Sequence, residues 1–290
     1  MKPRYILLYL TVLAFASCYP PEEPITRVKR YPMAAGNQWH YQRVISVFNF
    51  RPVVTGTASP ETTFIFSTDV NVVGQVTLNG IETWKVQTVE NENGNSLAAY
   101  DFYKETPDTL YLVAYSGISA EVYPEQKYRE PVTFSYGGFT SRSFTELVRY
   151  LQGYRRTVSG TGIDSITYEE GPVIPFAFPL QTFMGWNYRT ADFSPGWRIF
   201  KRVSGLDFMR VNQIIYPVFK IEWFWDTHHS GVWDPNMDGY DFFSTNGLLR
   251  REFILKNFVL LGSNSPTDTL GLFDYREDYI VQSMSVQTTR

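Results

Sequence analysis

The segment from Asp234 to Asp241 carries oxygen-bearing residues at alternating positions, a pattern that could bind a hard cation. It reads D-P-N-M-D-G-Y-D, which matches the first half of a calcium loop. Carboxylate and amide oxygens are ligands that Ca²⁺ takes, and the glycine permits the sharp turn that makes them converge. The ligands predicted on this basis are Asp234, Asn236, Asp238, the carbonyl of Tyr240, and Asp241. The alternative is a metal-free hairpin tip, because Asp, Asn and Gly favour turns and Thr245 stands at the twelfth position.

Histidine, the usual general base, occurs only at His40, His228 and His229. His40 lies in an alternating segment that predicts a surface or packing role. His228 and His229, with Asp226, only weakly indicate a transition-metal site, because adjacent residues of a strand point to opposite faces. The sequence contains no G-x-S-x-G elbow, H-E-x-x-H, Walker loop or G-x-G-x-x-G motif. We therefore predict no catalytic residue and no enzyme.

Two carboxylate pairs, Glu90-x-Glu92 and Glu169-Glu170, lie in glycine-flanked segments. The sequence predicts them to be solvated turn residues. A hydrolase with spatially assembled acids is the alternative, because glycosidases use two carboxyl groups that only the fold brings together.

The N-terminus predicts export. Lys2 and Arg4 precede an apolar run over 5–14 that is too short to span a bilayer as a helix, so it indicates a cleavable signal peptide. The segment 15–18, F-A-S-C, resembles a bacterial lipobox, with Phe15 where that motif usually has Leu. The resemblance implies a signal peptide over 1–17 and acylation of Cys18, palmitate included, at the only cysteine of the chain.

Residues 18–26 include the acidic, proline-rich run YPPEEP and predict an extended tether. Tyr19 is not the aspartate of inner-membrane retention in enteric lipoproteins, so the resemblance implies the outer membrane. Glu22 and Glu23 are loosely similar to acidic surface-export signals. We expect a lipid-anchored protein that faces the periplasm or the cell surface.

Composition excludes other classes. The chain has 290 residues, 43% hydrophobic, 17% aromatic and 19% charged, so it is not wholly disordered. A net charge of −3 leaves no basic excess for a nucleic-acid partner. A single cysteine allows neither an internal disulfide nor a cysteine-based zinc site. We predict that no cofactor is required, with Ca²⁺ as the alternative.

Short runs rich in β-branched and aromatic residues predict an all-β fold, an antiparallel sandwich, barrel or half-barrel. The predicted strands are Gln38–Phe48, Thr62–Phe66, Thr83–Val89, Thr109–Tyr115, Val218–Trp225 and Leu248–Phe258. Asn79-Gly80 and Asn93-Gly94 predict hairpin turns.

At most one short helix is expected. Ser143 and Glu146 have capping-box spacing, and apolar residues recur at helical intervals up to Gly153. The same residues are also compatible with a strand.

A repeat organises the chain. Residues 31–41 align without gaps with residues 178–188, with an aromatic residue, Pro, an aliphatic residue, Trp and Tyr at matching offsets. The match predicts two duplicated β modules over 27–140 and 172–290, joined by a linker over 141–171. A chance match in an aromatic-rich chain is the alternative.

The opening residues Y-P-M, G-N and W-H-Y of the segment 31–41 resemble the Y-P-L-x-x-G-N-x-W-x-Y motif of uncharacterised β-rich bacterial envelope lipoproteins. Trp225 and the segment 246–252 are similar to the ending of that group. The resemblance implies location and fold, and carries no activity.

We therefore expect a non-enzymatic envelope protein of binding or structural type, with an envelope protein or a glycan as partner. A second hypothesis is a glycan- or ligand-binding module that Ca²⁺ assists through the loop 226–246. Flat rings that could stack on sugars are concentrated in the second module, at Trp186, Trp197, Trp223, Trp225 and Trp233. The hydrolase is the third.

Overall fold

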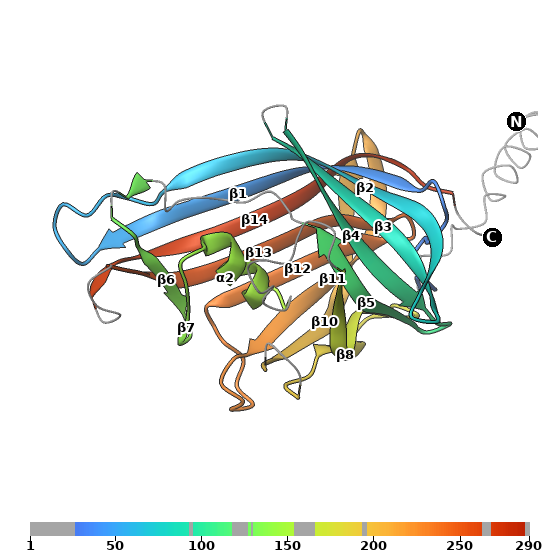
Figure 1. Cartoon of the computed structure of the whole chain (residues 1–290). Helices are drawn as coiled ribbons and strands as arrows, with labels where there is room; N and C mark the ends of the chain where they lie inside the picture. The colour runs from blue at the N-terminus through green and yellow to red at the C-terminus, as the bar shows by residue number, and fades with distance from the viewer. Residues whose placement is uncertain are drawn as a thin grey trace, which may run out of the picture.

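The computed structural model describes residues 27–92, 95–117, 127–128, 130–153, 166–192, 196–262 and 268–287 (Figure 1). The predicted signal peptide, Cys18, the tether and the Asn93-Gly94 turn lie outside the described residues. No helix in the described part of the chain is long and apolar enough to cross a membrane.

Within these ranges, fourteen strands form one sheet, and its paired strands are antiparallel. Twelve strands follow the order β8-β5-β4-β3-β2-β1-β14-β13-β12-β11-β10-β9, and β6 pairs with β13 and β7. The strands are β1 (Gln38–Pro52), β2 (Thr62–Leu78), β3 (Ile81–Glu92), β4 (Asn95–Glu105), β5 (Thr109–Gly117), β6 (Thr133–Tyr136), β7 (Phe139–Ser141), β8 (Ile166–Ala177), β9 (Gly185–Arg189), β10 (Arg198–Val211), β11 (Ile214–Asp226), β12 (Met237–Ser244), β13 (Gly247–Leu261) and β14 (Thr269–Ser285). All six predicted strands are present, and Asn79-Gly80 forms the β2–β3 turn with positive φ at both residues.

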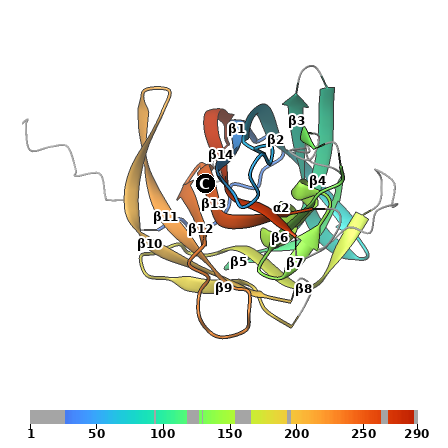
Figure 2. The ribbon, with the colours of Figure 1, turned by 90° about the vertical axis from the view of Figure 1, so that its left-hand side faces the viewer.

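The sheet curls into a nearly closed barrel (Figure 2). Strands β1–β5 and β8 form one six-stranded meander, strands β9–β14 form another, and β1 pairs with β14 where they meet. At the second seam β8 lies beside β9, and Trp186 Nε1 donates to the carbonyl of Ile174 at 3.0 Å. The predicted all-β, antiparallel, barrel-like fold is confirmed.

One helix, α2 (Phe144–Leu151), packs against the inner side of this barrel. Ser143 caps it by accepting a hydrogen bond from the backbone N–H of Glu146 at 3.2 Å. All four of its core-facing residues are buried, namely Phe144, Leu147, Val148 and Leu151. The helical interpretation of this segment is confirmed, and the strand alternative is wrong because the cap and the 3.6-residue period act together.

The two copies of the eleven-residue repeat have the same backbone structure. Gly36 and its equivalent Phe183 both adopt positive φ, 89° and 68°. Their N–H groups donate to the carbonyls of Val72 on β2 and Val203 on β10, each at 2.9 Å. A β-bulge follows each valine. The predicted linker over 141–171 contains α2 and the first residues of β8, which completes the first meander.

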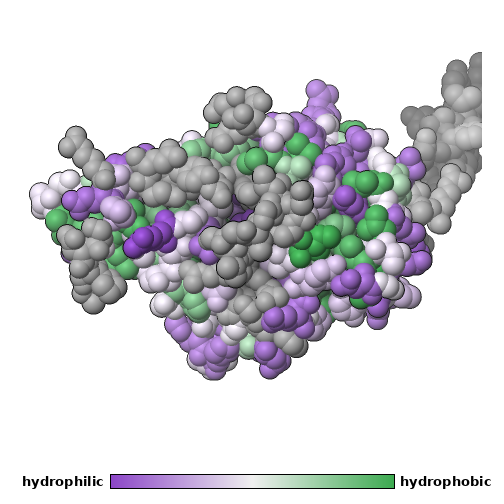
Figure 3. Space-filling model, viewed as in Figure 1, coloured by the Kyte–Doolittle hydropathy of each residue, from purple (hydrophilic) through white to green (hydrophobic). Residues whose placement is uncertain are grey.

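Apolar residues fill the barrel in two clusters. One cluster surrounds α2 and includes Trp225, Phe258 and Tyr275, and the other includes Trp39 and Phe243 near the start of β1. The outer surface is mixed, with hydrophobic residues interspersed among hydrophilic ones along the face seen in Figure 3. The two clusters leave a space between them inside the barrel.

Candidate ligand-binding site

A cavity of about 190 Å³ lies inside the barrel, between the two apolar clusters. This is space for several water molecules or a small ligand. Aromatic rings dominate its wall, and five of them are tyrosines. The other polar side chains of the wall are Thr88, Asp101, Gln152 and Arg251. A mostly apolar concave site with a few convergent polar groups is the usual form of a small-molecule site.

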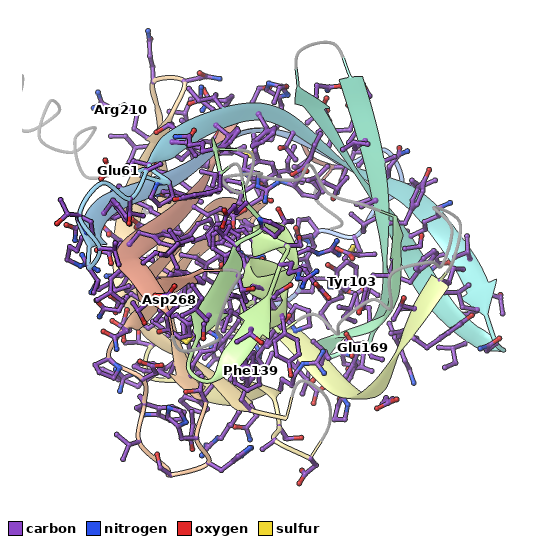
Figure 4. All side chains as sticks on the ribbon, turned by 60° about the vertical axis from the view of Figure 1, so that its left-hand side comes forward. Glu61, Tyr103, Phe139, Glu169, Arg210 and Asp268 are labelled. Carbon is purple, nitrogen blue, oxygen red and sulfur yellow. The ribbon has the colours of Figure 1, made fainter. Side chains whose placement is uncertain are left out.

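Asp101 brings a carboxyl group from β4 to this cavity. The hydroxyl of Tyr103, labelled in Figure 4, donates to Asp101 Oδ2 at 3.0 Å. Burial raises the pKa of Asp101 above 3.8, although the Tyr103 hydrogen bond and the charges of Arg149 and Arg251 act in the opposite direction. The carboxyl is therefore easier to protonate than a free aspartate, and can offer either a hydrogen-bond donor or an acceptor to a guest.

The matching strand pairings of the two meanders give Asp101 a positional counterpart in Asp241. Asp101 pairs with Val86 of β3, and Asp241 pairs with Ile221 of β11, at the same distance from the bulge that follows each repeat. Both aspartates stand in the tripeptide Tyr-Asp-Phe. The preceding tyrosine rings lie under a lysine ammonium in both copies, at 4.0 and 4.4 Å from Nζ to the ring centroid.

Asp241 is tied into a buried ion-pair network. Lys201 Nζ lies 3.0 Å from Asp241 Oδ2, and Arg251 Nε lies 2.6 Å from Oδ1, while the Lys201 and Asp241 side chains are 0% exposed. Burial acts to raise the pKa of Asp241, but Arg251 and Lys201 outweigh it and hold that pKa below 3.8. Burial lowers the pKa of Lys201 to about 7, against the attraction of Asp241. Asp241 is therefore ionised, and its two carboxylate oxygens are held in the ion pairs with Lys201 and Arg251.

The two aspartates differ because their neighbours differ. Lys201 on β10 corresponds to Val70 on β2, since each lies opposite the repeat tryptophan of its own copy. Arg251 corresponds to Tyr115, since each lies opposite the aspartate. Val70 and Tyr115 carry no positive charge, so the pKa of Asp101 is raised while that of Asp241 is lowered. The positions equivalent to Lys201 and Arg251 therefore supply no cation to Asp101, and its carboxyl lies at the cavity wall.

Trp223 lines the cavity and brings a buried indole N–H to its wall. Its side chain is 4% exposed and its ring lies 3.6 Å from Lys201 Nζ. Within the described residues the indole Nε1 has no hydrogen-bond partner. A buried donor without an acceptor costs stability, so an acceptor on a bound molecule would satisfy it.

Glutamates predicted to be solvated lie inside the barrel. Arg43 donates to Glu90 Oε1 at 2.7 Å and to Glu277 Oε1 at 2.6 Å, with all three side chains at most 7% exposed. Glu169 lies 2.8 Å from Arg189 NH2, across the β8–β9 seam. The turn interpretation of Glu90 and Glu169 is wrong, because nearby glycines suggested turns where β3 and β8 continue as strands and distant arginines compensate the charges.

The predicted calcium ligands are not brought to one point. Asp238 pairs with Lys256 at 2.9 Å, Asn236 Oδ1 accepts from Asn257, and Asp234 Oδ1 accepts from the backbone N–H of Asn236. β12 begins at Met237, so Asp238 and Tyr240 face outward while Asp241 faces the interior. The five residues do not fit the predicted coordination shell. Throughout the described ranges, no group of three or more His, Cys, Asp or Glu side chains is placed to hold a metal ion.

The remaining candidates lie away from the cavity. His40 is on the outer surface, with Nδ1 2.7 Å from Asp69 Oδ1, and His228 and His229 are exposed. Four of the five tryptophans proposed to stack on sugars are buried in the barrel, which agrees with the core alternative. These are Trp186, Trp197, Trp223 and Trp225.

Sequence reasoning missed Asp101. The available signal was the second occurrence of Tyr-Asp-Phe, at 100–102 and 240–242, with a lysine fifteen residues before the first tyrosine and twenty before the second. The eleven-residue repeat alone ends too early to reveal this pair. Only the strand pairings align the two tripeptides.

No family model matches the chain, and no curated protein matches it. Two solved structures are similar over 88% of the chain. One is a Parabacteroides distasonis protein described as a lipoprotein, with 10% identity, a TM-score of 0.26 and 97% of its own chain covered. The other is a Bacteroides fragilis protein described as exported and as having a YmcC-like fold, with 7% identity, a TM-score of 0.27 and 98% of its chain covered.

Proposed function

We propose that this chain is a lipid-anchored protein of the bacterial cell envelope whose barrel binds a small molecule without transforming it. The observation that carries the binding role is the interior cavity, where Asp101 and the Trp223 indole N–H stand among aromatic rings. The observation that supports the location is the lipobox-like segment ending at Cys18. The outer membrane is the proposed attachment site, with the barrel in the periplasm or at the cell surface.

Binding is favoured over hydrolysis by the charges around the cavity. A pair of acids would need one proton donor and one base or nucleophile on either side of the substrate. Asp101 has a raised pKa, but its counterpart Asp241 is held by Lys201 and Arg251. The three histidines are on the outside of the barrel or on exposed loop positions. A single carboxyl among aromatic rings can bind a hydrogen-bond donor of a guest molecule, but it lacks the second acid that hydrolysis needs.

The wall indicates the chemical class of the guest. Aromatic residues line the cavity from both meanders, including Tyr41 and Tyr188, the last residues of the two repeats. A planar ring system would pack against such a wall. Asp101 would accept a hydrogen bond from an amine or hydroxyl of the guest, and Trp223 would donate to an acceptor. We therefore propose a small aromatic or amphipathic molecule with at least one hydrogen-bond donor.

A fluorescent aromatic amine, 1-aminoanthracene, tests this role. We expect saturable binding with enhanced emission, and competition by small aromatic amines. Val86→Phe, which places a ring in the cavity wall, is expected to weaken binding at least about tenfold, since filling the site removes about 1.4 kcal/mol or more of contact. Asp101→Asn is expected to weaken it by a similar factor through the loss of a charged acceptor.

The matched control is Ile65→Phe, which adds the same ring at a residue of β2 that is 61% exposed. Its probe affinity should equal that of the parent. Equal affinity of the parent and Val86→Phe, with both folded by circular dichroism, would place the probe outside the cavity and remove the basis of the proposed binding role.

Lipid attachment is tested at Cys18. In a bacterial host fed labelled palmitate, the parent is expected to carry label and to enter the detergent phase, because acyl chains contribute roughly 0.8 kcal/mol per buried methylene. Cys18→Ala should carry no label. A parent whose mass corresponds to the unmodified chain with its initial Met, or a variant that is labelled equally, contradicts the anchoring.

A further inference from the structure

The β10–β11 hairpin projects beyond the neighbouring strands (Figure 2). Large apolar side chains are exposed along it. Phe208 is 71% exposed, Ile214 and Ile215 are each 56% exposed, and Leu206 is 49% exposed. Large apolar side chains gathered at a protruding tip mark an interaction surface more often than chance exposure does.

Strand register places Leu206, Phe208 and Ile215 on one face, while Ile214, which pairs with Val211, lies on the other. Phe208 pairs with Pro217, and Arg210 pairs with Ile215. Because alternate residues share a face, Leu206, Phe208, Arg210, Ile215 and Pro217 all point the same way. Arg210 points away from the barrel at the tip (Figure 4). The hairpin is held to the protein by Val211 and Val218 on the opposite face and by Phe219, which pairs with Leu206, since all three belong to the buried cluster near the start of β1. We call the first face the apolar tip.

The duplicated counterpart of this hairpin is different. Beyond its bulge, the β2–β3 hairpin exposes Gln75, Thr77, Asn79 and Glu82, with Ile81 as its one exposed large apolar side chain. Both hairpins satisfy the same fold, so the fold does not require an apolar tip. The tip therefore needs a separate explanation.

The predicted anchor enters the barrel beside this hairpin. Val28 forms a β-bridge with Leu180, and three residues later Phe183, 80% exposed, donates its N–H to Val203 of β10. Arg27 is the ninth residue after Cys18, which allows a reach of up to about 30 Å. The apolar tip begins at Leu206, only three residues after Val203. A lipid attached at Cys18 and the apolar tip can therefore reach one bilayer surface together.

We infer that the apolar tip inserts into the lipid surface to which Cys18 is attached, and fixes the orientation of the barrel there. The inference rests on the proposed lipid anchor. Phe, Ile and Leu side chains at a rigid tip bury their area in the headgroup and acyl boundary, while Arg210 remains at the level of anionic headgroups. The loop at 226–236, at the opposite end of β11, then faces away from the membrane.

The test uses the full, lipidated chain with Arg210→Cys, which adds a single free thiol because acylation blocks Cys18. The thiol is labelled with the environment-sensitive fluorophore NBD, and the protein is reconstituted in phosphatidylethanolamine and phosphatidylglycerol vesicles with or without a doxyl-labelled lipid quencher. The control is Ile65→Cys, on β2 and far from the tip in strand order. We expect the quencher to reduce NBD emission at 210 about twofold more than at 65, because an interfacial segment lies within ~10 Å of the acyl boundary.

Adding Phe208→Ser and Ile215→Ser should abolish that difference, and both residues are exposed enough for the barrel to remain folded. Equal quenching at 210 and 65 overturns the inference even when mass spectrometry shows an acylated Cys18. An emission rise at 210 that depends on protein concentration and not on the quencher lipid also overturns it, in favour of a second copy of the chain. If Cys18 is unmodified, the anchor proposal fails by itself, and quencher-dependent loss at 210 on added vesicles still supports the apolar tip.

Discussion

Asp241→Asn is expected to lower the free energy of unfolding by about 3–5 kcal/mol, the usual cost of breaking a buried ion pair from one side. The substitution keeps the size of the side chain and removes its charge. Lys201, which is 0% exposed, and Arg251 then lose the carboxylate that compensates them. Denaturant unfolding of the parent and the variant at pH 7 measures the difference.

The pH dependence gives a second readout. The pKa of Asp241 is held below 3.8, so the folded state binds its proton less readily than the unfolded state. Its contribution to stability is therefore complete above pH 3.8 and is lost as the pH falls through the lowered pKa. The parent should lose stability on acidification below pH 4, and Asp241→Asn should lack that part of the loss.

Asp101→Asn is the matched control, because it makes the same change at the duplicated position. Burial raises the pKa of Asp101, so the fold disfavours its ionised form and stability decreases as the pH rises through that raised pKa. At pH 7 the variant is expected to be as stable as the parent or more stable, and its amide oxygen can still accept from Tyr103. Equal losses of stability in Asp101→Asn and Asp241→Asn would contradict the division of roles between the two aspartates.

Strands and the helix were predictable because local patterns dictate them. In the predicted strand Thr83–Val89, Val86 and Thr88 are two residues apart and therefore share a face, and both line the cavity. The capping box at Ser143 predicted α2, and Asn79-Gly80 predicted a hairpin turn. Each of these features depends on residues within one turn or one strand, so the sequence contains all the necessary information.

The candidate site was not predictable, because it depends on charges brought together from distant strands. Asp241 looked like a calcium ligand since Asp, Asn and Gly have the same signature in a metal loop and in a turn that leads into a strand. Its cations come from β10 and β13, forty residues before it and ten residues after it. Asp101 looked like any solvated aspartate, because neither its burial nor the absence of a lysine at Val70 can be read locally.

The division into modules also depends on non-local pairing. The repeat at residues 31–41 and 178–188 marks where each meander begins, and its turns are the same in both copies. The first meander ends with β8, which follows α2 in the sequence. The predicted boundary at residue 171 divides this strand between the linker and the second module, because local patterns do not show that β8 pairs with β5. Pairing of β1 with β14 then joins residues more than 240 apart, as at Gln38 and Ser285. The spacing of apolar residues and the strand propensity of single residues do not show which distant strands pair, so they could not predict the pairing of β1 with β14.

Arg43→Met is expected to cost about 3–5 kcal/mol or more, because it removes the shared cation from two carboxylates inside the barrel. Glu90 and Glu277 both bind this guanidinium, and their side chains are 2% and 1% exposed. Tyr275 and Gln152 also donate to Glu277, at 2.8 and 2.5 Å, but neither is charged. Two carboxylates of like charge would then share a low-dielectric interior with no cation between them.

Removing the two carboxylates should rescue this variant, and that response separates lost charge compensation from lost packing. Adding Glu90→Gln and Glu277→Gln to Arg43→Met should restore much of its stability at pH 7, because neither amide carries a charge that needs a cation. Arg202→Met breaks a pair with Glu222 in which the arginine is 49% exposed, and is expected to cost at most about 1 kcal/mol. An Arg43→Met variant whose stability is unaffected by the two glutamine substitutions would show that Arg43 acts through its hydrocarbon chain, against Phe66 and Tyr279, and not through its charge.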